Sequence, residues 1–152
     1  MHMSRIEWIV AVSVYLLVAG AGLYVFERSR NSQAEVTCQS SMGMLADAIF
    51  KYAKDHDHHL PSARNWWSDI YPKYCHEDDP CPKAQRSSGV AYAMSAELSG
   101  VDVRTIEHPD RVILLYEACN GVPEYRHRGG MNVAYADGHR AWIPRPKQED
   151  FR

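Results

Sequence analysis

The segment WIVAVSVYLLVAGAGLYVF, residues 8 to 26, decides how this chain is organised. Its nineteen residues carry no charge. As a helix rising about 1.5 Å per residue, they reach roughly 28 Å, close to the ~30 Å hydrocarbon core of a bilayer. The segment from Trp8 to Phe26 therefore predicts a single transmembrane helix, with the lipid bilayer as its partner.

A cleaved secretory signal peptide is the main alternative for this segment. Arg5 precedes it, and Ala19-Gly20-Ala21 offers the small-x-small pattern that a signal peptidase reads. The apolar run nevertheless continues through Leu23 to Phe26, beyond that site. We therefore favour a retained anchor.

A second helical pattern follows the span. The polar stretch from Glu27 to Gln39 holds no Gly or Pro, and the next apolar residues recur at the spacing of one helix face: Met42, Leu45, Ile49 and Tyr52. Leu60-Pro61 marks the end of this pattern, because the residue before a proline is disfavoured in helical geometry. The anchor and this amphipathic helix are expected to form one continuous element.

The part of the chain after the span is expected to fold as one compact unit. The chain has 152 residues and a net charge of −2, with acidic and basic residues interspersed. This pattern lacks the basic stripe expected of a nucleic-acid-binding protein. We predict a transmembrane segment with short flanks over residues 1–30 and a head domain over residues 31–152.

Four cysteines are candidates for disulfides: Cys38, Cys75, Cys81 and Cys119. They can pair in three ways, and buried thiols or a metal set are the alternatives. An even set of this kind is typical of a protein outside the cytosol. By contrast, Arg28 and Arg30 after the span outnumber Arg5 before it, which favours a cytoplasmic C-terminal side.

The clearest local signal in the head is a β-hairpin. Residues 132–136 and 139–143 flank Asp137-Gly138, a pair suited to a two-residue type I′ turn. In that register Val133 lies opposite Trp142. Residues 112–116 predict a short buried strand, and residues 68–71 one turn of helix. The expected fold class is α+β, with a long N-terminal helix packed on a small antiparallel sheet.

The head carries a recognisable motif. His127, nine intervening residues, then Asp137 and Gly138 resemble the His-x9-Asp-Gly signature of bacterial prepilin-like and pseudopilin-like proteins. Further landmarks appear in the same order as in that group: Cys38 in an amphipathic helix, Tyr52-Ala53-Lys54-Asp55, Leu60-Pro61, Cys81-Pro82, residues 92–95 and His108-Pro109-Asp110-Arg111-Val112. Together they cover most of residues 35–143.

The resemblance implies a pilin-like fold anchored in the bacterial cytoplasmic (inner) membrane. It places the N-terminus in the cytoplasm and the C-terminal domain in the periplasm, which overrides the arginine count. Prepilins are cut after a small residue preceding a Phe-led apolar start, whereas Met1 to Glu7 offers no Gly before a Phe. We therefore expect a permanently anchored accessory subunit of a larger membrane complex. The alternative is a pseudopilin of a type II secretion or type IV pilus-like machine.

Candidate metal ligands lie near the predicted turn. His127, Asp137 and His139 offer imidazole and carboxylate groups to a divalent cation, and the resemblance adds that pseudopilin heads include calcium binders. Turn formation explains Asp137 more simply, with His127 hydrogen-bonded to the turn backbone. The histidines between Lys54 and Leu60 are interpreted as a solvated helix end.

No catalytic or cofactor-binding residues are predicted. The chain has no nucleophile elbow, Walker loop, dinucleotide fingerprint or Cys-x-x-Cys-His haem motif. We infer a non-catalytic subunit that works by contact with other proteins, with no nucleic acid and no small-molecule substrate. Exposed aromatics suit such contacts, and the candidates, for which a core role is the alternative, are Trp66, Trp67, Tyr71 and Tyr74.

Overall fold

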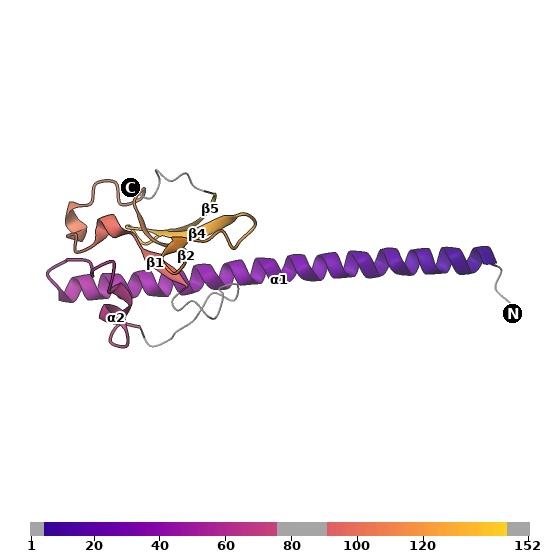
Figure 1. The fold of residues 1–152 in the computed structure, drawn as a ribbon, viewed down its shortest axis with the longest axis horizontal. Coiled ribbons are helices and arrows are strands. Elements are labelled where there is room, and N and C mark those ends of the chain that lie inside the picture. Colours follow the sequence, from indigo (N-terminus) through magenta and orange to yellow (C-terminus); the bar gives the residue numbers. More distant parts are fainter. Residues whose placement is uncertain (1–4, 76–90, 146–152) are drawn as a thin grey trace. The chain divides into compact units, whose positions relative to one another are not determined.

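A computed structural model of the chain describes residues 5–75 and 91–145. Its helices are α1 (Arg5–Asp55) and α2 (Trp66–Ile70), with two short 3₁₀ helices, η1 (Ala96–Leu98) and η2 (Val103–Thr105). Its strands are β1 (Tyr92–Met94), β2 (Ile113–Cys119), β3 (Val122–Pro123), β4 (Gly130–Tyr135) and β5 (Arg140–Pro144) (Figure 1). The predicted α+β class, a long apolar N-terminal helix with a small antiparallel sheet, is confirmed.

The chain divides into two compact units, the first ending at Gln33 and the second beginning at Ala34. In the first unit, the described part of α1 exposes large apolar side chains on all its sides, among them Trp8, Leu17 and Phe26. Among the described residues, α1 is the one helix that is long and apolar enough to cross a membrane. A helix that can span a membrane is what the sequence predicts for residues 8 to 26.

In the second unit, α1 presents one buried stripe to the core. Cys38, Met42 and Ile49 are fully buried, and Leu45 lies between them on the same face, as the helical spacing predicts. The helix ends at Asp55. Asp57 and His58 then adopt positive φ angles of 52° and 67°, which a helix does not continue through, so the predicted stop before Leu60-Pro61 is confirmed.

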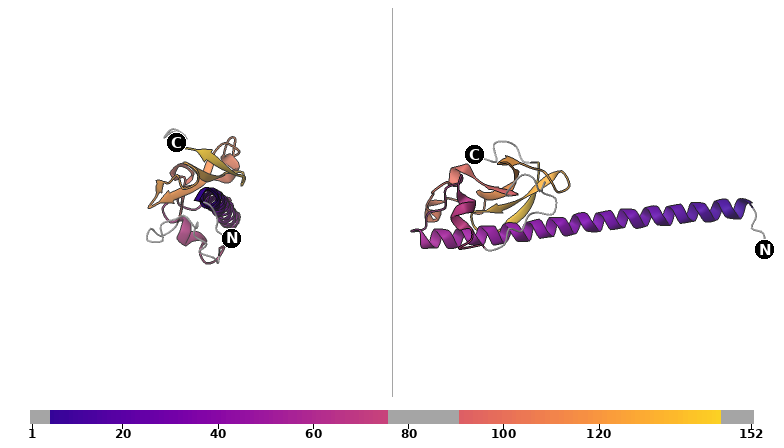
Figure 2. Two further views of the ribbon diagram at one scale, coloured as in Figure 1. Left: turned by 90° about the vertical axis from the view of Figure 1, so that its right-hand side faces the viewer. Right: turned by 60° about the horizontal axis from the view of Figure 1, so that its bottom comes forward.

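The sheet is antiparallel throughout. Its order is β1-β2-β4-β5, and β3 pairs with β2. Figures 1 and 2 show the sheet along one side of α1 in this unit. The strand expected over residues 112–116 is β2, and the helical turn expected over 68–71 is α2.

The two faces of the sheet have different environments. Along β4, Ala134 belongs to the core shared with α1, whereas Met131 and Val133 point to the other face. There they pack with Ile113 and half-buried side chains that include Tyr116, Tyr125 and Tyr135. Period-two alternation thus gives β4 apolar contacts on both faces, and β4 is buried along nearly its whole length.

The predicted hairpin forms, but its turn differs from the prediction. Strands β4 and β5 pair Val133 with Ala141 and Ala134 with Arg140, so Val133 does not lie opposite Trp142. The Gly138 amide donates to the Tyr135 carbonyl over 2.9 Å, and Gly138, unlike Asp137, has a positive φ of 91°. This is a three-residue loop with glycine in the left-handed position, and it shifts the register by one.

The register shift has a structural consequence. A one-residue change moves every β5 side chain to the opposite face of the sheet. Ala141 packs with the outer cluster, while Arg140 reaches α1, where its guanidinium occupies the space that a Cβ on Gly43 would need. The glycine in the helix thus makes room for an arginine from the sheet.

Candidate functional site

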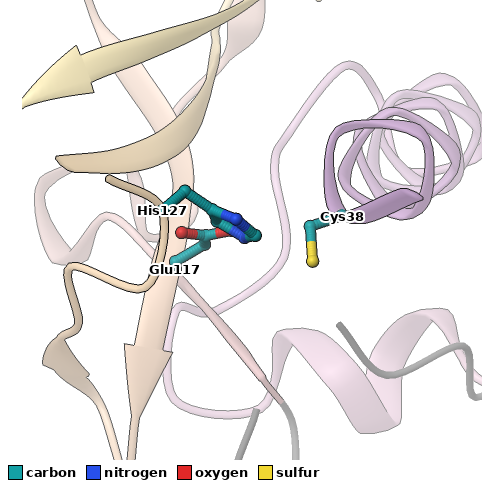
Figure 3. A group of neighbouring side chains, drawn as sticks. All are labelled: Cys38, Glu117 and His127. Carbon is teal, nitrogen blue, oxygen red and sulfur yellow. The ribbon is translucent and has the colours of Figure 1, made fainter. Parts of the chain in front are cut away.

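A buried polar cluster lies between the sheet and α1. It consists of Glu117 from β2, His127 from the turn before β4, and Asn132 from β4, and all three are at most 1% exposed. Figure 3 shows the Glu117 and His127 side chains pointing toward one another, with Cys38 of α1 facing them. Burial of this many polar groups requires each to find partners inside the protein.

A tight turn fixes the position of His127. Arg128 and Gly129 have φ angles of 52° and 75°, as a two-residue hairpin turn needs. The backbone groups of His127 pair with Gly130 in both directions, over 3.2 and 2.9 Å. In addition, the Trp142 indole donates to the His127 carbonyl over 2.7 Å. The backbone of His127 is therefore held by Gly130 at the start of β4 and by Trp142 of β5.

The imidazole and the carboxylate form a buried pair. His127 Nε2 lies 3.0 Å from Glu117 Oε1, and neither side chain is exposed. A carboxylate only accepts hydrogen bonds, so Nε2 carries the proton and donates it. Polar groups are retained in protein interiors when they are hydrogen-bonded in this way.

Asn132 completes the hydrogen bonds of Glu117 and connects the pair to α1. Its side-chain amide donates to Glu117 Oε1 over 2.9 Å, and its backbone amide donates to Oε2 over 3.2 Å. Its own side-chain oxygen accepts from Gln39 Nε2 over 3.0 Å. One continuous chain of hydrogen bonds thus runs from the helix to His127.

A second stripe on α1, formed by Glu35, Gln39 and Gly43 at four-residue spacing, faces the hairpin. Arg128 Nη2 lies 2.5 Å from Glu35 Oε1, and Arg140 Nη1 donates to the Gln39 carbonyl over 3.3 Å. The next contact along the stripe is that of Arg140 with Gly43. This stripe runs beside the apolar one and sets how far along the helix the hairpin docks.

Cys38, Glu117 and His127 are also the one group of potential metal ligands found among the described residues. Their ligand atoms all lie within 4.8 Å of one another. Cys38 is disulfide-bonded in this state, so its sulfur is not a thiolate. Without a thiolate at Cys38, only Glu117 and His127 remain as ligands, and they are already joined to each other by a hydrogen bond.

The predicted disulfide set can be placed only in part. Cys75 and Cys119 are thiols, so no two of the three described cysteines are bonded to each other. Cys81 lies outside the described residues. The pairing therefore remains a prediction.

The residues predicted near the turn separate into two places. Asp137 and His139 come together at the surface, where Asp137 Oδ1 accepts from the His139 backbone amide over 3.0 Å and lies 2.6 Å from its Nδ1. The His139 ring stacks on Tyr135, with 4.2 Å between centroids. His127 belongs to the buried cluster, and Gly138 supplies the turn.

Hydrogen bonding perturbs the Asp137 carboxyl. The backbone amide of His139, and then its side chain, lower the pKa of Asp137 below its usual value, because both stabilise the charged form. The same contacts show that the Asp137 carboxylate caps the turn.

The histidines at the end of α1 do not converge into a ligand group among the described residues. His56 stacks on Tyr52 with 3.8 Å between centroids, and His59 Nδ1 contacts the Asp57 carbonyl at 3.0 Å.

Arg126 is a structural residue that the sequence does not single out. Its side chain is 2% exposed, and its guanidinium pairs with Glu124 at 2.7 Å. It also donates to the backbone carbonyls of Ala91 and Ala118, and so ties the chain before β1 to the end of β2. The other site residues that the sequence does not single out are Glu117, Asn132 and Gln39. The available signal for Glu117 was a charged residue inside an apolar strand.

Comparison of the chain with protein-family models, curated proteins and solved structures finds no match.

The first prediction concerns the buried carboxylate. Glu117→Gln should lower the free energy of unfolding by about 3 kcal/mol, because an amide offers one acceptor oxygen where the site supplies three donors, which leaves buried donors without a partner. Urea unfolding of the full chain in detergent, followed by tryptophan fluorescence, measures the change. Exposed Glu107→Gln is the matched control, with an expected change within about 0.5 kcal/mol. An unchanged midpoint for Glu117→Gln contradicts the role given to the cluster.

The second prediction concerns acid stability. Since the folded pKa of Asp137 lies below its unfolded value of 3.8, its stabilising contribution is complete above 3.8 and is lost as the pH falls through the folded pKa. Unfolding midpoints measured from about pH 5 to about pH 2 should therefore fall less steeply for Asp137→Asn than for the wild type. Exposed Asp47→Asn serves as the control and should retain the wild-type slope. Parallel slopes for wild type and Asp137→Asn would show that the turn contacts do not stabilise the carboxylate.

Proposed function

We propose that the chain is a non-catalytic, membrane-anchored structural or assembly subunit with a pilin-like head. The observation that carries the proposal is the first part of α1, whose apolar side chains are exposed on all sides. A helix of this kind has no polar face to present to water, whereas lipid suits every side of it, because all its backbone groups are bonded within the helix. The lipid bilayer is its proposed partner.

The head supports a role through contact with other subunits. The residues of its motif are used to build the fold, with His127 in the buried cluster and Asp137 and Gly138 in the loop. Exposed Tyr71 stacks on Trp67, with ring centroids 5.5 Å apart, and aromatics of this kind are enriched at protein interfaces. Trp66, in contrast, belongs to the core.

The proposed location is the bacterial inner membrane, with the N-terminus in the cytoplasm and the head in the periplasm. The disulfide at Cys38 supports this orientation, because such bonds persist outside the reducing cytosol. The resemblance of the head to pseudopilins supports the same side.

A pseudopilin of a secretion or pilus-like machine is the second candidate. It is favoured by the uninterrupted course of α1 from the apolar segment into the residues that form the head core. Mass spectrometry of the mature N-terminus from native membranes separates the candidates. A trimmed, methylated N-terminus supports the pseudopilin, and an intact one supports the permanently anchored subunit, whose partners would be sought by co-purification in mild detergent.

The anchor itself is tested by charge substitution. The full chain should remain in the membrane fraction after alkaline carbonate washing, and Val14→Arg with Leu17→Arg should move it to the soluble fraction, because each arginine costs about 2.5–3.5 kcal/mol at the centre of a span. Asn31→Arg with Ser32→Arg, which adds the same charge beyond the span, is the control.

Two results would contradict the proposal. One is release of the wild-type chain by carbonate, and the other is a purified form that lacks residues 1–21, as cleavage of a signal peptide after Ala21 requires. Protease added to spheroplasts tests orientation, since a periplasmic head is digested and a cytoplasmic one is protected.

A further inference from the structure

We infer that reduction of the Cys38 disulfide converts Cys38, Glu117 and His127 into a zinc site. The three side chains come from α1, β2 and the turn before β4, and all are buried. In Figure 3 the Cys38 sulfur lies on the side of α1 that faces the other two side chains. A thiolate, an imidazole and a carboxylate are donors that Zn²⁺ combines, with three protein ligands leaving a fourth position for water.

The spacing of the donors suits a metal of this size. Ligands at about 2.0–2.3 Å from a tetrahedral zinc ion lie roughly 3.3–3.7 Å from each other. The ligand atoms here fall within 4.8 Å, and His127 Nε2 is 3.0 Å from Glu117 Oε1. Small side-chain rotations are therefore enough, with the metal taking the place of the proton that now joins His127 to Glu117.

The surroundings already orient one ligand. Asn132 donates to both Glu117 oxygens, and Gln39 fixes the Asn132 side chain. Hydrogen bonds that hold a ligating carboxylate in place are a regular part of protein metal sites. The chain of hydrogen bonds that ties α1 to the sheet thus also preorganises the Glu117 carboxylate.

The disulfide is the condition that controls this site, because its sulfur cannot be a thiolate ligand while it is bonded. A dithiol reductant supplies two electrons and two protons, the S–S bond breaks, and two protein thiols and one oxidised reductant result. The Cys38 thiol then loses its proton as the Zn–S bond forms, and the Nε2 proton of His127 leaves to solvent or moves to Nδ1. The inference concerns the head alone and does not depend on the proposed anchor or partners.

The test uses a full-length chain in which Cys38 is the only cysteine, made by Cys75→Ser, Cys81→Ser and Cys119→Ser. Such a chain presents the Cys38 thiol without any reductant. Titration against a chromophoric chelator should show about one Zn²⁺ bound per chain. Co²⁺ should give a thiolate-to-cobalt charge-transfer band.

Adding Cys38→Ser to this chain is the matched control, since it keeps every histidine and carboxylate. Affinity should fall by more than ~100-fold, because the loss of a ligand exceeds the roughly 10–100-fold effect of losing a group that only orients one. Adding His127→Gln, which keeps a donor for Glu117, should also abolish the cobalt band. Circular dichroism confirms the fold of each variant.

Equal zinc affinity with and without Cys38 would overturn the inference, as would equally tight binding by the oxidised wild-type chain. If the chain with one cysteine does not fold, the same zinc and cobalt titrations are made on the wild type after treatment with a dithiol. A Co²⁺ charge-transfer band that disappears in Cys38→Ser supports the site, and a band that persists, or none at all, refutes it.

Discussion

The hydrogen bond between Gln39 of α1 and Asn132 of β4 is the contact on which the head depends. It is the link by which a buried polar cluster on the sheet reaches the helix. Leaving a buried polar group without a partner costs about 1–3 kcal/mol, and more for a charged group. Apolar packing along Met42, Leu45 and Ile49 supplies most of the attraction between helix and sheet, but such contacts tolerate sliding. The polar groups are satisfied in one register, and so they select it.

This view gives the His-x9-Asp-Gly spacing a structural meaning. His127 opens the Arg128-Gly129 turn and pairs with Glu117, β4 then runs from Gly130 to Tyr135, and Asp137 and Gly138 form the next turn. The motif therefore spans one strand and the turn at each end of it. Its histidine is fixed by burial and its aspartate by capping of the turn, so neither residue requires a ligand to explain its presence.

Local patterns in the sequence were sufficient to predict the apolar span, the buried stripe of the amphipathic helix, β2 and the last hairpin. The register of that hairpin was not predictable from Asp137-Gly138, because the pair suits both a two-residue turn and a three-residue loop, and the choice shifts the pairing by one residue. By contrast, the turn between β2 and β3 has a clear local signal, because Asn120-Gly121 is a pair that favours tight hairpin turns. Strand β1, only three residues long, had little periodicity to reveal it.

The candidate site was harder to predict for a physical reason. The ring of His127 pairs with a carboxylate ten positions earlier, and Asn132 pairs with a helix residue far away in sequence. Such partners are brought together only by the tertiary fold, and a glutamate within an apolar strand does not reveal which residue satisfies it. The sequence thus singled out His127 and grouped it with Asp137 and His139 as metal candidates, whereas in the structure its ring pairs with Glu117.

A double-mutant cycle on Gln39→Ala and Asn132→Ala tests most directly whether the polar contact holds the helix on the sheet. Free energies of unfolding are measured for the wild type, both single variants and the double variant. The account predicts a coupling energy of about 0.5–3 kcal/mol, because each single substitution removes the same hydrogen bond. Effects that add to within about 0.3–0.5 kcal/mol would mean that the two residues act independently, and would contradict the claim that this bond fixes the register.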